Sequence, residues 1–158
     1  MVASQTTWSF TRPDRLPLPQ PFEEALPYWE SLKRGELRLQ KCQQCGEVSH
    51  PPKAMCSSCY SFNMGWELMS GRGTVYSYIV TRQPIHPALV GHTPFATAQI
   101  QLEEGPIVTS NIIDVPPDEI TIGLPVRATF EAVNDDVTLL YFVATFRVPS
   151  RPALREAT

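Results

Sequence analysis

The chain has 158 residues, of which 42% are hydrophobic and 18% charged, and this length predicts one compact domain with room for a small appendage. Its formal charge is -3 and its pI about 5.6, so the sequence lacks the basic surplus with which proteins bind nucleic acids. No apolar run approaches the ~20 residues of a membrane span, and the first residues lack the pattern of a secretion signal, so we expect a cytoplasmic protein without a membrane partner.

The first 36 residues (1–36) are expected to combine an extended arm with a short helical segment. Four prolines between positions 13 and 21 remove amide donors and hold residues 1–21 extended. From residue 22 the apolar side chains recur at helical spacing, and Pro27 either starts a second short helix or kinks a single one. Gly35 follows two basic residues, which is a typical end of a helix.

This N-terminal segment carries aromatic side chains for which two roles are open. They either pack against the chain's own domain or form an exposed surface that binds a partner. Aromatic residues are favoured anchors at the centres of interfaces, and a proline-rich arm loses little conformational entropy when it docks. The predicted interface residues are Trp8, Phe10, Phe22, Tyr28 and Trp29.

All four cysteines lie in one stretch, KCQQCGEVSHPPKAMCSSCY, inside a predicted metal ribbon that covers residues 37–65. They form two C-x-x-C pairs separated by ten residues, and an alternating run before them predicts a short strand. Thiols stay reduced in the cytosol, and two such turns supply the four tetrahedral ligands of a structural zinc, with iron as an alternative. A thioredoxin-type redox site is the competing interpretation, although it usually needs only one pair. The predicted ligands are Cys42, Cys45, Cys56 and Cys59.

Two other residues of this stretch bear on the metal. Gly46 follows the first pair, where a metal knuckle often needs a residue with positive φ. His50 could replace a cysteine as ligand, but with four thiolates available we favour a histidine at the surface or beside the ligands. Four thiolates leave no open coordination position, so the metal would organise the fold rather than hydrolyse a substrate.

The rest of the chain reads as short strands separated by turns that contain glycine or proline. The segments are rich in β-branched and aromatic residues, and Asn134 begins a turn that joins the last two as a hairpin. Five strands without intervening helices predict a mainly β protein with a five-stranded OB-fold barrel over residues 66–148, and a small sandwich is the alternative. Residues 149–158 are expected to be a loose tail. The predicted strands are 74–83, 95–102, 107–113, 126–132 and 137–146.

The sequence shows few features of an enzyme that acts on its own. It contains three histidines and none of the common hydrolase, metalloprotease, phosphate-binding or dinucleotide-binding motifs. The proline-rich connection at residues 81–95 is either a binding loop or an ordinary surface loop. We therefore assign no catalytic residue.

The order of these segments resembles a known family. The resemblance is carried by YWESLKRGELRLQKCQQCGEVSHPPKAMCSSC, by WELMSGRGTVYSYIV directly after it, by PFATAQIQLEEG and by IGLPVRATFE, and it spans about residues 20–148. The chain is similar to the acyl-CoA-associated proteins in which a helical segment, a rubredoxin-like zinc ribbon and an OB-fold follow one another. It departs from the family pattern at Tyr60, where glycine is usual, and at His50, where an aromatic residue is commoner.

The resemblance implies an accessory subunit of a thiolase-superfamily enzyme, such as a thiolase, an acyltransferase or a steroid side-chain aldolase. The catalytic residues would belong to the thiolase-fold partner, and this chain would bind that partner's dimer in a hetero-oligomer and shape or shield the acyl-CoA channel. The family turn entering the first barrel strand maps onto Ser70–Gly73, and the start of the next strand onto Pro94 and Phe95. The residues that would contact acyl-CoA are Gly71, Arg72, Gly73, Pro94 and Phe95.

Two other functions are carried as alternatives. Proteins that bind single-stranded nucleic acid also combine an OB-fold with a zinc ribbon, but they need a basic groove, and residues 81–158 hold five basic against nine acidic residues. The second alternative is a stand-alone acyl-CoA-binding protein. For Gly71 and Gly73, a β-bulge that bends the barrel strand explains the glycines as well as a ligand contact does.

Overall fold

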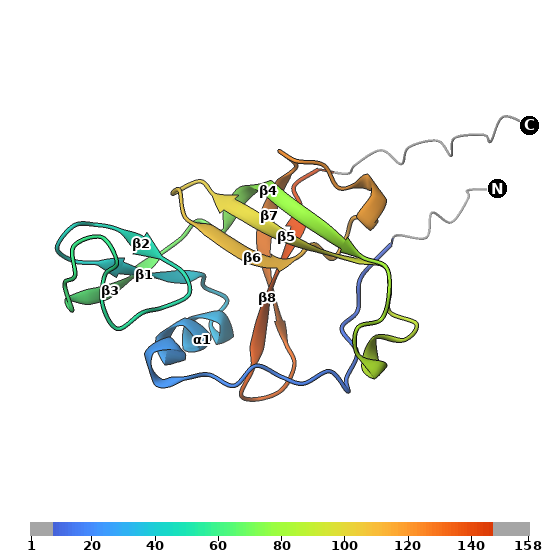
Figure 1. The fold of residues 1–158 in the computed structure, drawn as a ribbon, viewed down its shortest axis with the longest axis horizontal. Coiled ribbons are helices and arrows are strands. Elements are labelled where there is room, and N and C mark those ends of the chain that lie inside the picture. Colours follow the sequence, from blue (N-terminus) through green and yellow to red (C-terminus); the bar gives the residue numbers. More distant parts are fainter. Residues whose placement is uncertain (1–7, 147–158) are drawn as a thin grey trace, which may run out of the picture.

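The computed structural model describes residues 8–146, in which a small three-stranded sheet and one helix lie beside a five-stranded barrel (Figure 1). The predicted mainly β fold, with a short N-terminal helix, a ribbon and an OB-fold barrel, is confirmed. The predicted tail at 149–158 and the first seven residues of the predicted arm lie outside the described residues.

The helical segment consists of a 3-10 turn, η1 (Glu23–Ala25), followed directly by α1 (Leu26–Lys33). Of the two predicted roles of Pro27 the first is correct: it stands in the first turn of α1, where a missing amide hydrogen costs nothing. The helix ends as expected at Gly35, which has a φ of +71° and donates its N–H to the Leu32 carbonyl.

The ribbon is an antiparallel sheet with the strand order β2-β1-β3. Its strands are β1 (Arg38–Cys42), β2 (Val48–Ser49) and β3 (Met64–Leu68). The short strand before the cysteines was expected, whereas β3 was not, because a five-residue segment containing glycine carries a weak strand signal. β3 pairs along the whole of β1, so the chain leaves the ribbon beside the point where it entered.

The barrel strands follow the order β6-β5-β4-β7-β8, which excludes the sandwich alternative. Each predicted strand is present, with ends that coincide or differ by at most two residues, and buried residues alternate with less buried ones along β5. Two short 3-10 turns, η2 (Pro87–Leu89) and η3 (Pro117–Glu119), lie in the connections. The strands are β4 (Arg72–Thr81), β5 (Phe95–Leu102), β6 (Ile107–Asn111), β7 (Pro125–Ala132) and β8 (Thr138–Ala144).

The barrel closes along a short seam between the end of β6 and β8. One parallel bridge joins Ile112 to Phe142, and the Ile113 N–H donates to the Phe142 carbonyl over 3.1 Å. Side chains extend this contact, because the Ser110 hydroxyl donates to the Leu140 carbonyl over 2.6 Å and the Asp114 carboxylate accepts from the Ala144 N–H over 3.0 Å. The seam therefore relies on side chains where a full strand ladder is lacking.

One hydrophobic core spans the helix, the ribbon and the barrel. Leu32 of α1 and Leu39 of β1 are buried in the same cluster as Ile100, Val126 and Phe142 of the barrel. Because α1 supplies core side chains, the N-terminal segment is part of the folding unit and not a detachable appendage.

The described part of the arm, residues 8–21, lies against this chain. In Figure 1 it runs in blue along one side of the barrel before it reaches α1. The Phe10 N–H donates to the Ile113 carbonyl over 2.9 Å, and the Phe10 ring packs on Phe95 with 5.3 Å between ring centroids. Of the two roles left open for the aromatic residues, packing on the chain's own domain thus accounts for Phe10.

A glycine at the start of β4 is required by the closeness of β5. A Cβ atom at Gly73 would lie 2.4 Å from the Gln101 carbonyl oxygen and 2.9 Å from Ile100 Cγ2. We expect Gly73→Ala to lower the free energy of unfolding by about 1–3 kcal/mol, because backbone atoms must move to admit the methyl group. Gly65→Ala is the matched control, since its Cβ would meet only the flexible Gln43 side chain. Denaturant unfolding checks both, and equal effects of the two substitutions would refute the explanation.

Candidate metal centre and binding surfaces

The four predicted ligands converge at the tip of the ribbon. Their sulfur atoms all lie within 4.8 Å of one another, with Cys42 and Cys59 Sγ 3.5 Å apart and Cys45 and Cys56 Sγ 3.6 Å apart. Four thiolates at the usual Zn–S distance of ~2.3 Å form a tetrahedron with edges of about 3.8 Å, so the cluster fits one tetrahedral ion. The four cysteines are thus positioned to hold a structural metal.

The two C-x-x-C turns have the same backbone geometry although their sequences differ. After the first pair, Gly46 has a φ of +80° and donates its N–H to the Cys42 carbonyl over 2.9 Å, as predicted for a knuckle. After the second pair, Tyr60 takes the same place with a φ of +60° and donates to the Cys56 carbonyl over 3.0 Å. Tyr60 thus holds a left-handed conformation that costs a non-glycine residue about 1–2 kcal/mol.

Backbone amides of the knuckles favour the thiolate form of two ligands, Cys42 and Cys56, whereas burial and hydrogen bonds with neighbouring thiols raise the pKa of Cys45 and Cys59. The N–H of Cys45, and after it that of Gln44, lowers the pKa of Cys42 to about 6 against the opposing effect of burial. The amides of Cys59 and Ser58 likewise lower the pKa of Cys56. Because all four positions of the tetrahedron are taken by this chain, the site leaves no place for a substrate.

His50 is not among the residues that converge on the metal position. Its ring packs on Tyr28 of α1, with 5.0 Å between ring centroids, and burial lowers its pKa. His50 therefore joins the ribbon to the helix. Its position outside the ligand set agrees with the prediction that the four cysteines are the ligands.

Sequence reasoning missed Gln40, which is buried on β1. Its side-chain amide donates to the Lys53 carbonyl and accepts from the Lys53 N–H, each over 2.8 Å. This pair of bonds fixes the loop between the two knuckles onto β1. A polar residue at an inward position of a predicted strand was the only available signal.

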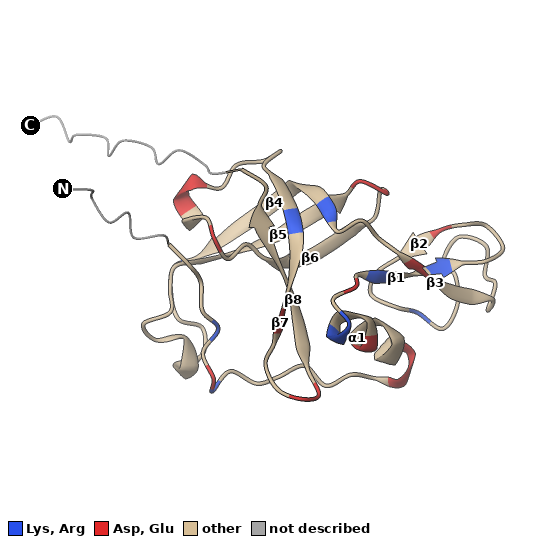
Figure 2. Ribbon diagram, turned by 180° about the vertical axis from the view of Figure 1, so that it is seen from behind, with Lys and Arg blue, Asp and Glu red and all other residues tan. Residues whose placement is uncertain are grey.

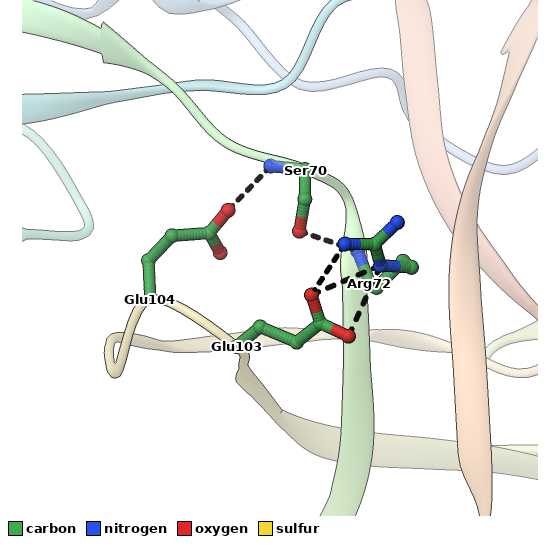
Figure 3. Close-up of polar contacts among 4 residues, drawn as sticks. All are labelled: Ser70, Arg72, Glu103 and Glu104. Carbon is green, nitrogen blue, oxygen red and sulfur yellow. Dashed lines mark hydrogen bonds and ion pairs between the residues drawn. The ribbon is translucent and has the colours of Figure 1, made fainter.

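Arg72 is engaged within the chain at the corner where β4 begins (Figure 3). Its Nε donates to both carboxylate oxygens of Glu103 over 3.0 and 2.9 Å, which raises the pKa of Arg72. Glu104 accepts from the Ser70 N–H over 2.6 Å in the same corner. The register shift in β4 lies farther on, between Val75 and Ser77, so a bulge does not explain the glycines that flank Arg72.

The residues predicted to contact acyl-CoA are not brought together as one compact site. β4 and β5 are antiparallel, with Gly73 opposite Leu102 and Thr81 opposite Phe95. At ~3.3 Å per residue, Gly73 and Phe95 lie on the order of 25 Å apart at opposite ends of this strand pair.

The predicted partner-interface residues differ in exposure. Phe22 is 51% exposed, whereas Trp8, Phe10 and Trp29 are half-buried. Tyr28 is buried in the chain's own core, so its expected exposure is wrong; it faces inward because it occupies the same side of α1 as Leu32.

Apolar side chains also stand exposed on the ribbon, where none was predicted as a contact. Phe62 and Tyr60 are 76% and 70% exposed, and Met55 lies partly exposed in the preceding loop. Contiguous exposed apolar groups are typical of protein interaction sites.

Within residues 8–146, no helix is both long and apolar enough to cross a membrane.

Comparisons with known proteins identify both parts of the molecule. Residues 29–65 match the family model for the ChsH2 rubredoxin-like zinc ribbon domain, and residues 66–131 match the model for the ChsH2 C-terminal OB-fold domain. A chain in the solved structure of the Ltp2-ChsH2(DUF35) aldolase has a TM-score of 0.74 and 32% identity, and the match covers 82% of this chain and 100% of that chain. The resemblance drawn from sequence motifs is thereby confirmed.

Two relatives of similar identity differ in how much of their own length this chain covers. The 3-oxo-4,17-pregnadiene-20-carboxyl-CoA hydratase alpha subunit of Mycobacterium tuberculosis is 34% identical over 119 residues, which are 75% of this chain and 37% of that subunit. A DUF35 domain-containing scaffold protein of Methanothermobacter thermautotrophicus is 36% identical over 115 residues, which are 72% of this chain and 86% of that protein. The chain thus spans little more than a third of the hydratase subunit but most of the scaffold protein.

The metal site is tested by removing one buried ligand. We expect the purified chain to hold about one metal ion, and Cys56→Ala to lose it, because three thiolates cannot complete the tetrahedron. The melting temperature should fall by roughly 10 °C or more, at about 2–4 °C per kcal/mol for a chain of this size. Elemental analysis and calorimetry measure both effects, with Ser57→Ala in the same turn as control. A folded wild-type chain with four titratable thiols and no metal would refute the site.

The strain at the second knuckle is tested separately. Tyr60→Gly removes an exposed side chain and relieves the left-handed conformation, which outweighs the entropy that glycine loses on folding. We expect the free energy of unfolding to rise by about 0.5–1 kcal/mol in denaturant titrations of the metal-loaded protein. A loss of stability would show that the Tyr60 side chain stabilises the fold.

Proposed function

The chain belongs to the DUF35 family, which joins a ChsH2-type rubredoxin-like zinc ribbon to an OB-fold domain, and from this membership we propose that it is a non-catalytic accessory subunit of a thiolase-fold enzyme. In this role it binds the partner's dimer as a hetero-oligomer in the cytoplasm and helps to form or shield the partner's acyl-CoA channel. The reaction, whether thiolysis, acyl transfer or aldol cleavage, belongs to the partner.

The observation that carries the proposal is the likeness to a whole chain of the aldolase assembly. Fold and sequence agree over the full length of that chain, which is named for two components, Ltp2 and ChsH2. The relatives named as an alpha subunit and as a scaffold protein are likewise parts of larger assemblies by their names. A chain whose metal position is saturated by its own thiolates fits a structural part of such an assembly.

The metal in this proposal is zinc. Zinc is the usual ion in ribbons with four cysteines, it has no redox chemistry, and its tetrahedral geometry matches the sulfur spacing. Its role is to fix the ribbon, so that the exposed Tyr60 and Phe62 are presented to the partner from a rigid tip. Zinc and iron are separated by the elemental analysis described above.

The partner contact is proposed for Phe22 and for the exposed ribbon aromatics. Phe22 precedes α1 and leaves half of its surface to solvent, although a phenylalanine gains from burial. Trp29 of α1 and Trp8 at the start of the described arm are each half-buried, so part of each ring is not covered by the chain itself. The described part of the arm docks on its own barrel, so it would present these aromatics pre-arranged and lose less entropy on binding.

A direct contact between Arg72 and acyl-CoA requires Arg72 to give up its ion pair with Glu103. A phosphate group would have to displace the Glu103 carboxylate, which already holds the guanidinium through both oxygens. We therefore propose that any contribution to the channel comes from one end of the β4–β5 pair and not from both. The single-strand alternative is disfavoured because basic residues are scattered over the described fold and do not line the barrel in a stripe (Figure 2).

Co-expression with a thiolase-fold enzyme of the same organism tests the accessory role. We expect a complex that co-purifies in size-exclusion chromatography with light scattering, and a partner that turns over acyl-CoA poorly without this chain. Phe22→Ala should weaken the complex by about tenfold, as is typical for loss of an aromatic anchor. Ile122→Ala is the matched control, since it removes an exposed apolar side chain on the barrel.

The opposite result is equally clear. If the chain stays monomeric beside that enzyme, and the enzyme is fully active alone, the accessory role is wrong. If the complex forms but Ile122→Ala disrupts it while Phe22→Ala does not, the interface lies on the barrel and the proposed contact residues are wrong.

A further inference from the structure

A cavity lies between the arm, α1 and the seam side of the barrel. Its volume is about 520 Å³, which is within the range of small-molecule sites. The walls are mostly apolar and come from the arm, α1, the loop at residues 85–89 and the strands β5, β6 and β8. Representative lining residues are Phe10 and Leu16 of the arm, Trp29 and Leu32 of α1, and Leu139 and Leu140 of β8.

A buried cation stands in the wall of this cavity. Arg12 is only 9% exposed, and its guanidinium donates to three carbonyl oxygens of the arm, those of Pro13, Leu16 and Pro17. These bonds shape the turn of the arm, but carbonyl groups are neutral and leave the positive charge uncompensated. Among residues 8–146, no carboxylate lies within ion-pair distance of Arg12. A buried charge without a counter-ion is costly, and an anion that enters the cavity would remove that cost.

A second polar group faces the same cavity. Tyr141 of β8 is 4% exposed and lines the cavity together with Arg12. Burial raises the pKa of Tyr141 to about 12, and the nearby Glu131 carboxylate acts in the same direction, so the hydroxyl stays a proton donor at neutral pH. Arg12 and Tyr141 both line this cavity, and the positive charge of Arg12 lowers the pKa of Tyr141 against these two effects. Glu131 itself is exposed on β7 and does not pair with Arg12.

We propose that this cavity binds a small apolar carboxylic acid, with its carboxylate on Arg12 and Tyr141 and its hydrocarbon body against the walls from α1 and β8. A guanidinium and a phenol supply the planar, charge-assisted donors that a carboxylate accepts. Arg12 is the one arginine or lysine in the described lining, which also includes His86 and Asn111. A single fixed cation suits a monoanion, whereas the several phosphate charges of coenzyme A would remain unmatched. The ligand is a free acid, and it is bound by this chain alone, so the inference does not rest on the proposed partner.

Binding would also join parts of the molecule that are far apart in sequence. The acid would contact Arg12 in the arm, Trp29 in α1 and Tyr141 in β8 at the same time. Because a ligand that binds only the folded state stabilises that state, occupancy should hold the arm against the barrel and raise the melting temperature.

Isothermal titration of the full metal-loaded chain with sodium decanoate, below its micellar concentration, tests the site. We expect saturable binding of one decanoate per chain. Decan-1-ol, which has the body without the charge, should bind at least about tenfold more weakly, and acetate, which has the charge without the body, should not bind measurably.

Three variants separate the polar contacts from the arm's own structure. Arg12→Gln removes the charge and should weaken decanoate binding by about 10–100-fold, and Tyr141→Phe keeps the ring and should weaken it by about 3–10-fold. Arg15→Gln removes an exposed arginine of the same arm and should leave the affinity unchanged. Arg12→Gln also removes the hydrogen bonds to the arm carbonyls and can disturb the conformation of the arm. If it does, the affinity of Tyr141→Phe for decanoate is the measurement that tests the site.

The proposal is overturned by any of three results. These are equal affinity for decanoate and decan-1-ol, unaltered decanoate binding by Tyr141→Phe, and an equal loss in Arg15→Gln and Arg12→Gln. The absence of saturable decanoate binding by the wild-type chain would also overturn it, whatever the outcome of co-purification with an enzyme.

Discussion

The continuous hydrophobic core is the constraint on which the other features depend. Leu37, directly before β1, and Leu39 on β1 are buried in the same cluster as Leu32 of α1 and Phe142 of the barrel. Each such side chain contributes about 1.5–3 kcal/mol when it is removed from water. The same strand that carries Cys42 into the metal cluster is thus anchored in the barrel at its other end. Ribbon, helix and barrel hold fixed relative positions for this reason, and the exposed aromatic tip has a defined orientation.

The sequence predicted best those features that neighbouring residues encode. Two C-x-x-C pairs specify a tetrahedral site by spacing alone, and an Asn134 turn between two alternating runs specifies a hairpin, where the Asn134 side chain accepts from the Val137 N–H. Strand ends were placed within two residues because prolines crowd the connections. Gly73 was noticed, but only the β5 carbonyl beside it supplies the reason for a glycine.

Features that depend on contacts between distant segments could not be read from the sequence. The side of α1 that faces inward is set by the barrel, so Tyr28 is a core residue although its pattern fits an exposed stripe equally well. Arg12 stands in a proline-rich segment without periodicity, where nothing predicts that its guanidinium is buried. The separation of Gly73 from Phe95 follows from antiparallel pairing, which places the start of one strand beside the end of the next.

The seam between β6 and β8 is held closed partly by the N-terminal arm. Where β6 meets β8 there is one bridge, at Ile112, and the rest of the closure is made by the Ser110 hydroxyl, the Asp114 carboxylate and the arm, whose Phe10 amide is tied to the Ile113 carbonyl. Local opening of a folded protein begins where the backbone hydrogen bonds between strands are fewest. We therefore expect the barrel to open first at this seam and not in the long β4–β5 pair. The arm covers the seam that has the fewest backbone hydrogen bonds between strands. How firmly the arm is docked therefore sets how often this seam opens and exposes the barrel interior to water.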